Sequence, residues 1–142
     1  MSALVSAPDQ SGSGPFHVIT HPLPPSLSGL ADNLVARITL CEESAIIWIG
    51  IPSEGAVQMG PLSASFPRQF DGDLLPSVAT LVGYEDESDN TTNMIAARIA
   101  KRVGWPIFVS FSASFGDDEG IRIALARLEK DVSDFLLEFK NR

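Results

Sequence analysis

The sequence contains few of the side chains on which metal sites, disulfides and catalytic relays depend. Its 142 residues include one cysteine and two histidines. The single cysteine, Cys41, cannot form an intrachain disulfide, and this Cys and His content does not match the ligand sets of structural zinc sites. We therefore expect no metal site and no disulfide framework. The composition suits a reducing compartment.

Positive charge is also scarce, and it is unevenly placed. The chain has 10 Lys and Arg residues against 18 Asp and Glu residues, a formal net charge of −8. Nucleic acids and anionic membrane surfaces attract clustered Lys and Arg, so we expect neither as a partner. Residues 1–97 contain eleven acids and two bases, whereas residues 98–142 contain seven acids and eight bases. The excess of acid is thus confined to the first part of the chain.

Long apolar runs are missing as well. The longest, residues 45–52, is far shorter than the roughly 20 residues that a membrane-spanning helix needs. The first residues lack the basic segment of a secretory signal. We expect a soluble protein of the cytoplasm and nucleus.

Motifs for catalysis and phosphate binding do not occur. The sequence has no Gly-x-Ser-x-Gly elbow, no Gly-rich loop followed by Lys-Ser/Thr, and no twelve-residue calcium loop. His17 and His21 lie near a Pro-rich segment, and Cys41 directly follows a predicted strand, where packing is the commoner role of a thiol. The sequence predicts no catalytic, cofactor-binding or metal-binding residue. A small-molecule-binding or enzymatic domain that uses Cys41 or His17 stays open as an alternative.

The chain is predicted to form one domain after a short lead-in. Residues 1–15 are rich in Ser, Gly, Pro and Ala, so burial cannot offset the entropy lost on ordering them. We expect this segment to be flexible. Apolar residues make up 44% of the chain, which is enough for residues 16–142 to form a single globular domain.

Hydrophobic periodicity predicts mostly strands first and helices later. Strand patterns occur at 16–20, 33–40, 45–51, 57–62, 77–82 and 107–111, and helical patterns at 85–103 and 121–139. The short connection between the second and third strands requires an antiparallel pair, and the unbroken apolar run at 45–51 indicates a strand covered on both faces. We predict an α+β fold, in which an antiparallel sheet of about five or six strands begins as a meander and is flanked by two main helices.

One charge pattern is a candidate partner-docking feature. Acids precede the first predicted helix, and bases project from it. These residues are Glu85, Asp86, Glu87, Asp89, Arg98, Lys101 and Arg102. Opposite charges can steer a protein partner and set its orientation. The alternative interpretation is an ordinary solvated helix face.

Several segments, taken in order, resemble one known family. They are Ile-Ile-Trp-Ile-Gly at 46–50, Thr-Leu-Val-Gly at 80–83, the acidic Ser/Thr-rich stretch at 86–92, Ala-Arg-Ile-Ala-Lys-Arg at 97–102, and Ile-Phe-Val-Ser-Phe at 107–111. Together with the last helix they resemble the proteasome assembly chaperone 4 family over residues 33–140.

The resemblance implies a fold and a function. The fold would be an antiparallel sheet flanked by helices. The function would be that of a non-enzymatic chaperone that forms a heterodimer with a proteasome assembly chaperone 3-like subunit and helps the α subunits of the 20S core to assemble, in the cytoplasm and nucleus. No cofactor is implied. An interaction module of an unrelated complex remains the other alternative.

Overall fold

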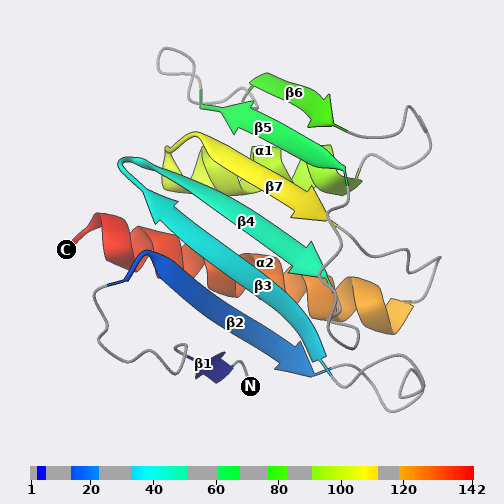
Figure 1. The fold of residues 1–142 in the computed structure, drawn as a ribbon. Coiled ribbons are helices and arrows are strands. Elements are labelled where there is room, and N and C mark those ends of the chain that lie inside the picture. The colour runs from blue at the N-terminus through cyan, green and yellow to red at the C-terminus, as the bar shows by residue number, and fades with distance from the viewer. Residues whose placement is uncertain are drawn as a thin grey trace.

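A computed structural model of the chain describes residues 3–5, 14–22, 33–50, 61–67, 77–82, 91–111 and 119–142. These residues form seven strands and two helices (Figure 1). The elements in chain order are β1 (Ala3–Val5), β2 (Phe16–Pro22), β3 (Asn33–Cys41), β4 (Ser44–Gly50), β5 (Leu62–Phe66), β6 (Ser77–Val82), α1 (Thr91–Val103), β7 (Ile107–Phe111) and α2 (Glu119–Lys140). Neither described helix is long and apolar enough to cross a membrane.

The described strands form one open sheet in the order β1-β2-β3-β4-β7-β5-β6. Neighbouring strands are antiparallel, except for β4 and β7, which run parallel. The predicted α+β class, with a mostly antiparallel sheet and two main helices, is confirmed. The predicted meander continues only to β4, because β7 returns from α1 and lies between β4 and β5. The nearly continuous apolar sequence of β7 suits a strand with a neighbour on each side.

One strand, β1, is absent from the sequence prediction. It lies inside residues 1–15, the segment expected to be a flexible lead-in, and it pairs antiparallel with β2 through Ala3 and Thr20, Leu4 and Ile19, and Val5 and Val18. Three residues are too few for an alternating pattern to stand out in a sequence. The predicted first strand at 16–20 corresponds to β2, which runs two residues further and ends at Pro22, a residue without the N–H donor of a strand ladder.

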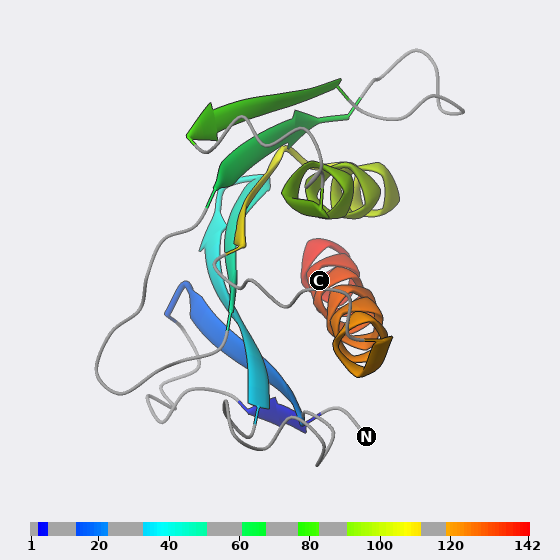
Figure 2. The same ribbon diagram turned by 90° about the vertical axis from the view of Figure 1, so that its right-hand side faces the viewer.

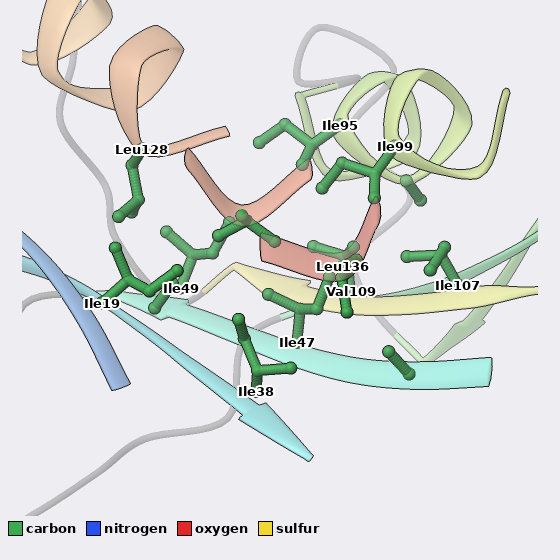
Figure 3. Packing of buried hydrophobic residues seen from close by; sticks show 14 of the residues in the cluster. Ile19, Ile38, Ile47, Ile49, Ile95, Ile99, Ile107, Val109, Leu128 and Leu136 are labelled. Carbon is green, nitrogen blue, oxygen red and sulfur yellow. The ribbon is translucent and has the colours of Figure 1, made fainter. Parts of the chain in front are cut away.

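Both helices lie on the same face of the sheet (Figure 2). The core forms between them and that face, and Figure 3 shows Ile95 and Ile99 of α1 and Leu128 of α2 directed toward the isoleucines of the strands. The largest fully buried side chains are Ile19, Leu34, Ile38, Ile47, Ile49, Ile95, Ile99, Ile107, Leu128, Leu136, Val103 and Val109. Each such side chain contributes about 1.5–3 kcal/mol through its removal from water.

The β3–β4 hairpin confirms the predicted antiparallel pair. Its strands pair from Val35 and Gly50 to Cys41 and Ser44, where the chain turns through Glu43 with a φ of 53°. The prediction that both faces of the following strand are covered holds for all but one of its described apolar residues. Ile47 is fully buried against the helices and Trp48, on the other face, is 7% exposed, whereas Ile46 on that same face is 43% exposed.

The strand predicted at 57–62 has a wrong C-terminal boundary, because β5 runs from Leu62 to Phe66. β5 begins at Leu62, the last residue of the strand predicted at 57–62, and residues 57–60 lie outside the described part of the chain. Ser63 and Ser65 point toward α1 and are buried, so the inward positions of β5 are polar and conceal the strand pattern. β6 matches the strand predicted at 77–82.

Both helices match their predicted patterns, and α1 has a defined C-terminal cap. Gly104 takes a φ of 79°, and its N–H donates to the carbonyl of Ala100 at 2.8 Å. The Lys140 ammonium donates to the carbonyl of Val103 at 2.7 Å. A left-handed glycine and a cation are typical of helix C-termini. Residues 85–90, the start of the first predicted helical pattern, lie outside the described residues.

Candidate protein-docking surfaces

The sheet face opposite the helices carries a row of mostly apolar side chains. Strand register places Phe16, Thr39, Ile46, Phe108 and Ala64 next to one another across β2, β3, β4, β7 and β5. Their strand neighbours point the other way, into the core, so this row faces away from α1 and α2. Phe16 is 66% exposed and Ile46 is 43% exposed, whereas Ala64 at the end of the row is 1% exposed. Apolar side chains are therefore presented on the side of the sheet that neither described helix covers.

Aromatic groups extend this row. The ring of Phe66, which is 46% exposed, meets the ring of Phe108 edge to face with centroids 6.1 Å apart. Arg37 of β3 places its guanidinium 5.3 Å from the ring centroid of Trp48 on β4. A cation within about 6 Å of an aromatic ring centroid is attracted by the ring. We call Phe16, Arg37, Ile46, Phe66 and Phe108 the open sheet face; Trp48 lies among them but is only 7% exposed.

Two of the three predicted docking bases instead join the helices to each other. The Nε and Nη2 atoms of Arg98 donate to both carboxylate oxygens of Glu129, with distances of 2.9 and 2.7 Å for the two shortest contacts. This hydrogen bonding, together with the charge of Glu129, raises the pKa of Arg98 above its ordinary value, although partial burial opposes the rise. Arg102 donates to Asp134 at 2.5 Å, and Lys130 also donates to that carboxylate at 3.1 Å.

The remaining predicted docking residues have different surroundings. Lys101 is exposed on α1, as is Arg127 on α2, and neither forms an ion pair with another described residue. The four predicted acids, Glu85, Asp86, Glu87 and Asp89, lie outside the described part of the chain. The structure therefore brings Arg98 and Arg102 to α2 and leaves Lys101 facing solvent.

The residues of the enzymatic alternative are not assembled into a relay. His17 lies on the core side of β2, where its ring is 4.8 Å from the ring of Phe135. Cys41 is exposed at the β3–β4 turn, and strand alternation directs it to the opposite face. His21 is buried and its Nε2 contacts Asp131 Oδ2 at 2.5 Å. Among the described residues no group of three or more His, Cys, Asp and Glu side chains is suited to a metal ion.

Sequence reasoning missed the open sheet face and the contact between His21 and Asp131. The unbroken apolar run of β4 was the available signal for the open sheet face, because a strand apolar on both sides needs a cover on each. No local signal connects His21 with Asp131, which are 110 positions apart.

Comparison with known proteins agrees with this architecture. Residues 33–112, which span β3 to β7, match the family model described as proteasome assembly chaperone 4. A chain in the crystal structure of a novel chaperone complex for yeast 20S proteasome assembly has a similar fold, with a TM-score of 0.57 and 16% identity. The similarity covers 87% of this chain and 98% of the yeast chain.

A curated relative matches over a shorter share of its own length. This is the alpha subunit of mitochondrial methylcrotonoyl-CoA carboxylase from Dictyostelium discoideum, which is 34% identical over 95 residues. The matched region is 67% of this chain but 12% of that protein. The family model covers more than half of the chain. The chain therefore belongs to the proteasome assembly chaperone 4 family.

Proposed function

We propose that this chain is a non-enzymatic chaperone for the α subunits of the 20S proteasome, and that it works as a heterodimer with a proteasome assembly chaperone 3-like subunit in the cytoplasm and nucleus. Membership of the proteasome assembly chaperone 4 family is the observation that carries the proposal. The similar yeast chain comes from a chaperone complex for 20S proteasome assembly, which supports a partner of this kind.

The open sheet face is the proposed contact with the sister subunit. Phe16, Ile46 and Phe66 expose apolar surface there, and their burial against another protein would remove it from water. A related subunit with a sheet of similar twist could stack face to face at about 10 Å, as two sheets do in a sandwich. Phe108, which is partly exposed, belongs to the aromatic residues that are enriched in such interfaces.

Charged residues of the helical layer are the proposed contact with α subunits. Lys101 is the predicted docking base that stays exposed without a described ion pair, and Arg127 adds a second exposed positive charge from α2. Glu85, Asp86, Glu87 and Asp89 remain part of the proposed docking pattern. Charges at the rim of an interface change association rates and orientation more than affinity. This contact is therefore proposed to steer α subunits during encounter.

Purification of the tagged chain from its own cells tests the proposal. A second small chaperone and unassembled α subunits should be recovered together with it, in a complex free of mature 20S particles. Replacement of Cys41 or His17 by Ala should leave this recovery unchanged. A monomer with a bound metabolite, or an unrelated set of partners, would contradict the proposed function.

A further inference from the structure

The outer side of the helical layer, which faces away from the sheet, carries an excess of positive charge. In Figure 2 no other described element lies over this side of α1 and α2. The described carboxylates that pair with bases there are those of Glu129 and Asp134. Five exposed bases surround them, namely Arg98, Lys101, Arg102, Arg127 and Lys130. Since the whole chain has a net charge of −8, this positive surface is a local feature of the helical layer.

One carboxylate neutralises two of these bases only in part. Asp134 accepts hydrogen bonds from Arg102 at 2.5 Å and from Lys130 at 3.1 Å. A single negative charge therefore faces two positive charges. The Lys130 side chain is 67% exposed, so a further carboxylate can reach it from solvent.

Two further bases have no carboxylate partner among the residues that the structure describes. Lys101 of α1 and Arg127 of α2 are both exposed, and neither forms an ion pair there. Glu129, two residues after Arg127, is already held at both oxygens by Arg98. The unmatched positive charges are therefore those of Lys101 and Arg127 and one of the two at Asp134.

The spacing of Arg127, Lys130 and Lys101 matches a helix that lies along the layer. Arg127 precedes Lys130 by three residues, which is about 4.5 Å along α2. Residues of α1 contact residues of α2 that are 31 or 32 positions later, so Lys101 is level with residues 132–133, about 3–4.5 Å beyond Lys130. Carboxylates three or four residues apart on one face of a helix are about 4.5–6 Å apart along its axis, so they can meet these bases in turn.

Other occupants fit this surface less well. A second copy of the chain, docked through a two-fold contact, would place the same bases opposite one another. A DNA duplex carries one phosphate charge for about every 1.7 Å of its axis, whereas here the bases are interspersed with Glu129 and Asp134, which repel phosphate. Discrete carboxylates of a protein can meet the unmatched bases and avoid these two acids.

We infer that the outer side of α1 and α2 binds an acidic helical segment of a protein partner, with the partner's carboxylates against Lys101, Arg127 and Lys130. The inference rests on the proposed function, because it gives the contact with α subunits a partner chemistry. Peptides take the place of α subunits in its test. It can therefore fail while the purification experiment succeeds, and the purification can fail while the peptides bind.

Three synthetic peptides serve as probes with the full-length chain. The first is an Ala- and Gln-rich helix former with Glu at every third or fourth position, the second has Lys in place of Glu, and the third keeps the Glu residues but has two central Pro that break the helix. The Glu peptide should bind at low salt and weaken as salt is added, because salt screens exposed charges. The Lys peptide should not bind, and the Pro peptide should bind about tenfold more weakly.

Single charge reversals locate the contact. Lys101→Glu and Arg127→Glu should each weaken binding of the Glu peptide about fivefold at low salt, because attraction becomes repulsion. Arg142→Glu makes the same change at an exposed position beyond the end of α2 and should weaken binding less than twofold. Lys140 is already about 15 Å along the helix from Lys130, and Arg142 lies beyond it, outside the Debye length of about 8–10 Å.

Coupling with a carbodiimide, which joins lysine amines to carboxylates, shows where the peptide lies. The lysines of the chain are Lys101, Lys130 and Lys140, and the Lys140 ammonium donates to the carbonyl of Val103. The Glu peptide should couple to Lys101 and Lys130 and not to Lys140. Equal binding of the Glu peptide by the wild type, Lys101→Glu and Arg127→Glu, coupling confined to Lys140, or tighter binding of a DNA duplex than of the Glu peptide would overturn the inference.

Discussion

Arg98 of α1 holds both carboxylate oxygens of Glu129 of α2, at 2.9 and 2.7 Å. One turn later Arg102 contacts Asp134, and at the end of α1 the carbonyl of Val103 accepts from Lys140. Residue numbers in the two helices rise together along these contacts, so α1 and α2 run parallel. The helical layer is therefore held together at three levels by polar contacts above the apolar core.

A double-mutant cycle on Arg98 and Glu129 should yield a favourable coupling energy. Arg98 is about half exposed, so solvent screens the pair, and exposed pairs contribute roughly 0.2–1 kcal/mol. The two-oxygen geometry places the expected coupling near the upper end of that range. Urea denaturation of the wild type, Arg98→Ala, Glu129→Ala and the double variant measures it. Additive single effects would show that the contact contributes nothing to stability.

Gly104→Ala should destabilise the fold. An L-residue in the left-handed region costs about 1–2 kcal/mol, and a Cβ at this position would lie 3.0 Å from Lys140 Nζ. For a domain of this size the melting temperature should fall by roughly 4 °C per kcal/mol. Gly104→Asn should cost less, because Asn tolerates this conformation better. Equal melting temperatures for the glycine and alanine forms would contradict the proposed strain.

His21→Ala should destabilise the chain more than Asp131→Asn. The His21 side chain is 6% exposed and its Nε2 lies 2.5 Å from Asp131 Oδ2. Removal of the ring leaves both a cavity and a half-buried carboxylate without this partner, a loss of about 1–3 kcal/mol. The amide introduced by Asp131→Asn keeps an oxygen that can accept a hydrogen bond from the ring. Chemical denaturation compares the two variants, and the reverse order of stability would contradict this account of the contact.

Reversal of Lys101 and Arg127 to Glu should slow association with unassembled α subunits without weakening the fold. Neither residue forms an ion pair with another described residue, unlike Arg98 and Arg102, whose reversal would also disturb the helical layer. The reduction in association rate should be larger at low salt than at high salt, because salt screens exposed charges. Stopped-flow mixing at two ionic strengths measures it. A rate unchanged at both would exclude this surface from the encounter.

Much of the fold could be predicted from local patterns. Alternation in β3 and the four-residue repeat of Ile95, Ile99 and Val103 report directly which sides meet the core, and Gly104 marks a helix end. Strand order could not be predicted in the same way, because the insertion of β7 between β4 and β5 depends on pairings between distant segments. The sequence also could not distinguish exposed bases from bases with partners on α2.

The candidate docking surfaces also depend on contacts between distant segments, which local sequence patterns do not reveal. Arg98 and Lys101 look alike in a helical pattern, yet only Arg98 reaches a carboxylate among the described residues, because Glu129 lies on the facing side of α2. The open sheet face combines residues of β2, β3, β4, β5 and β7, and no contiguous motif could reveal it. The apolar run of β4 predicts cover on both sides, which Trp48 has within the chain, whereas Ile46 on the same face is 43% exposed.

The affinity of the chain for the small chaperone subunit expected to co-purify with it tests the central claim most directly. Ile46 and Ile123 are matched, exposed isoleucines at 43% and 50%, one on the open sheet face and one on α2. Ile46→Asp should raise the dissociation constant by about 30-fold, the effect of losing a central contact of about 2 kcal/mol. Ile123→Asp should change it by less than about threefold. An Ile46→Asp variant that binds as tightly as the wild type would contradict the assignment of the open sheet face to the sister subunit.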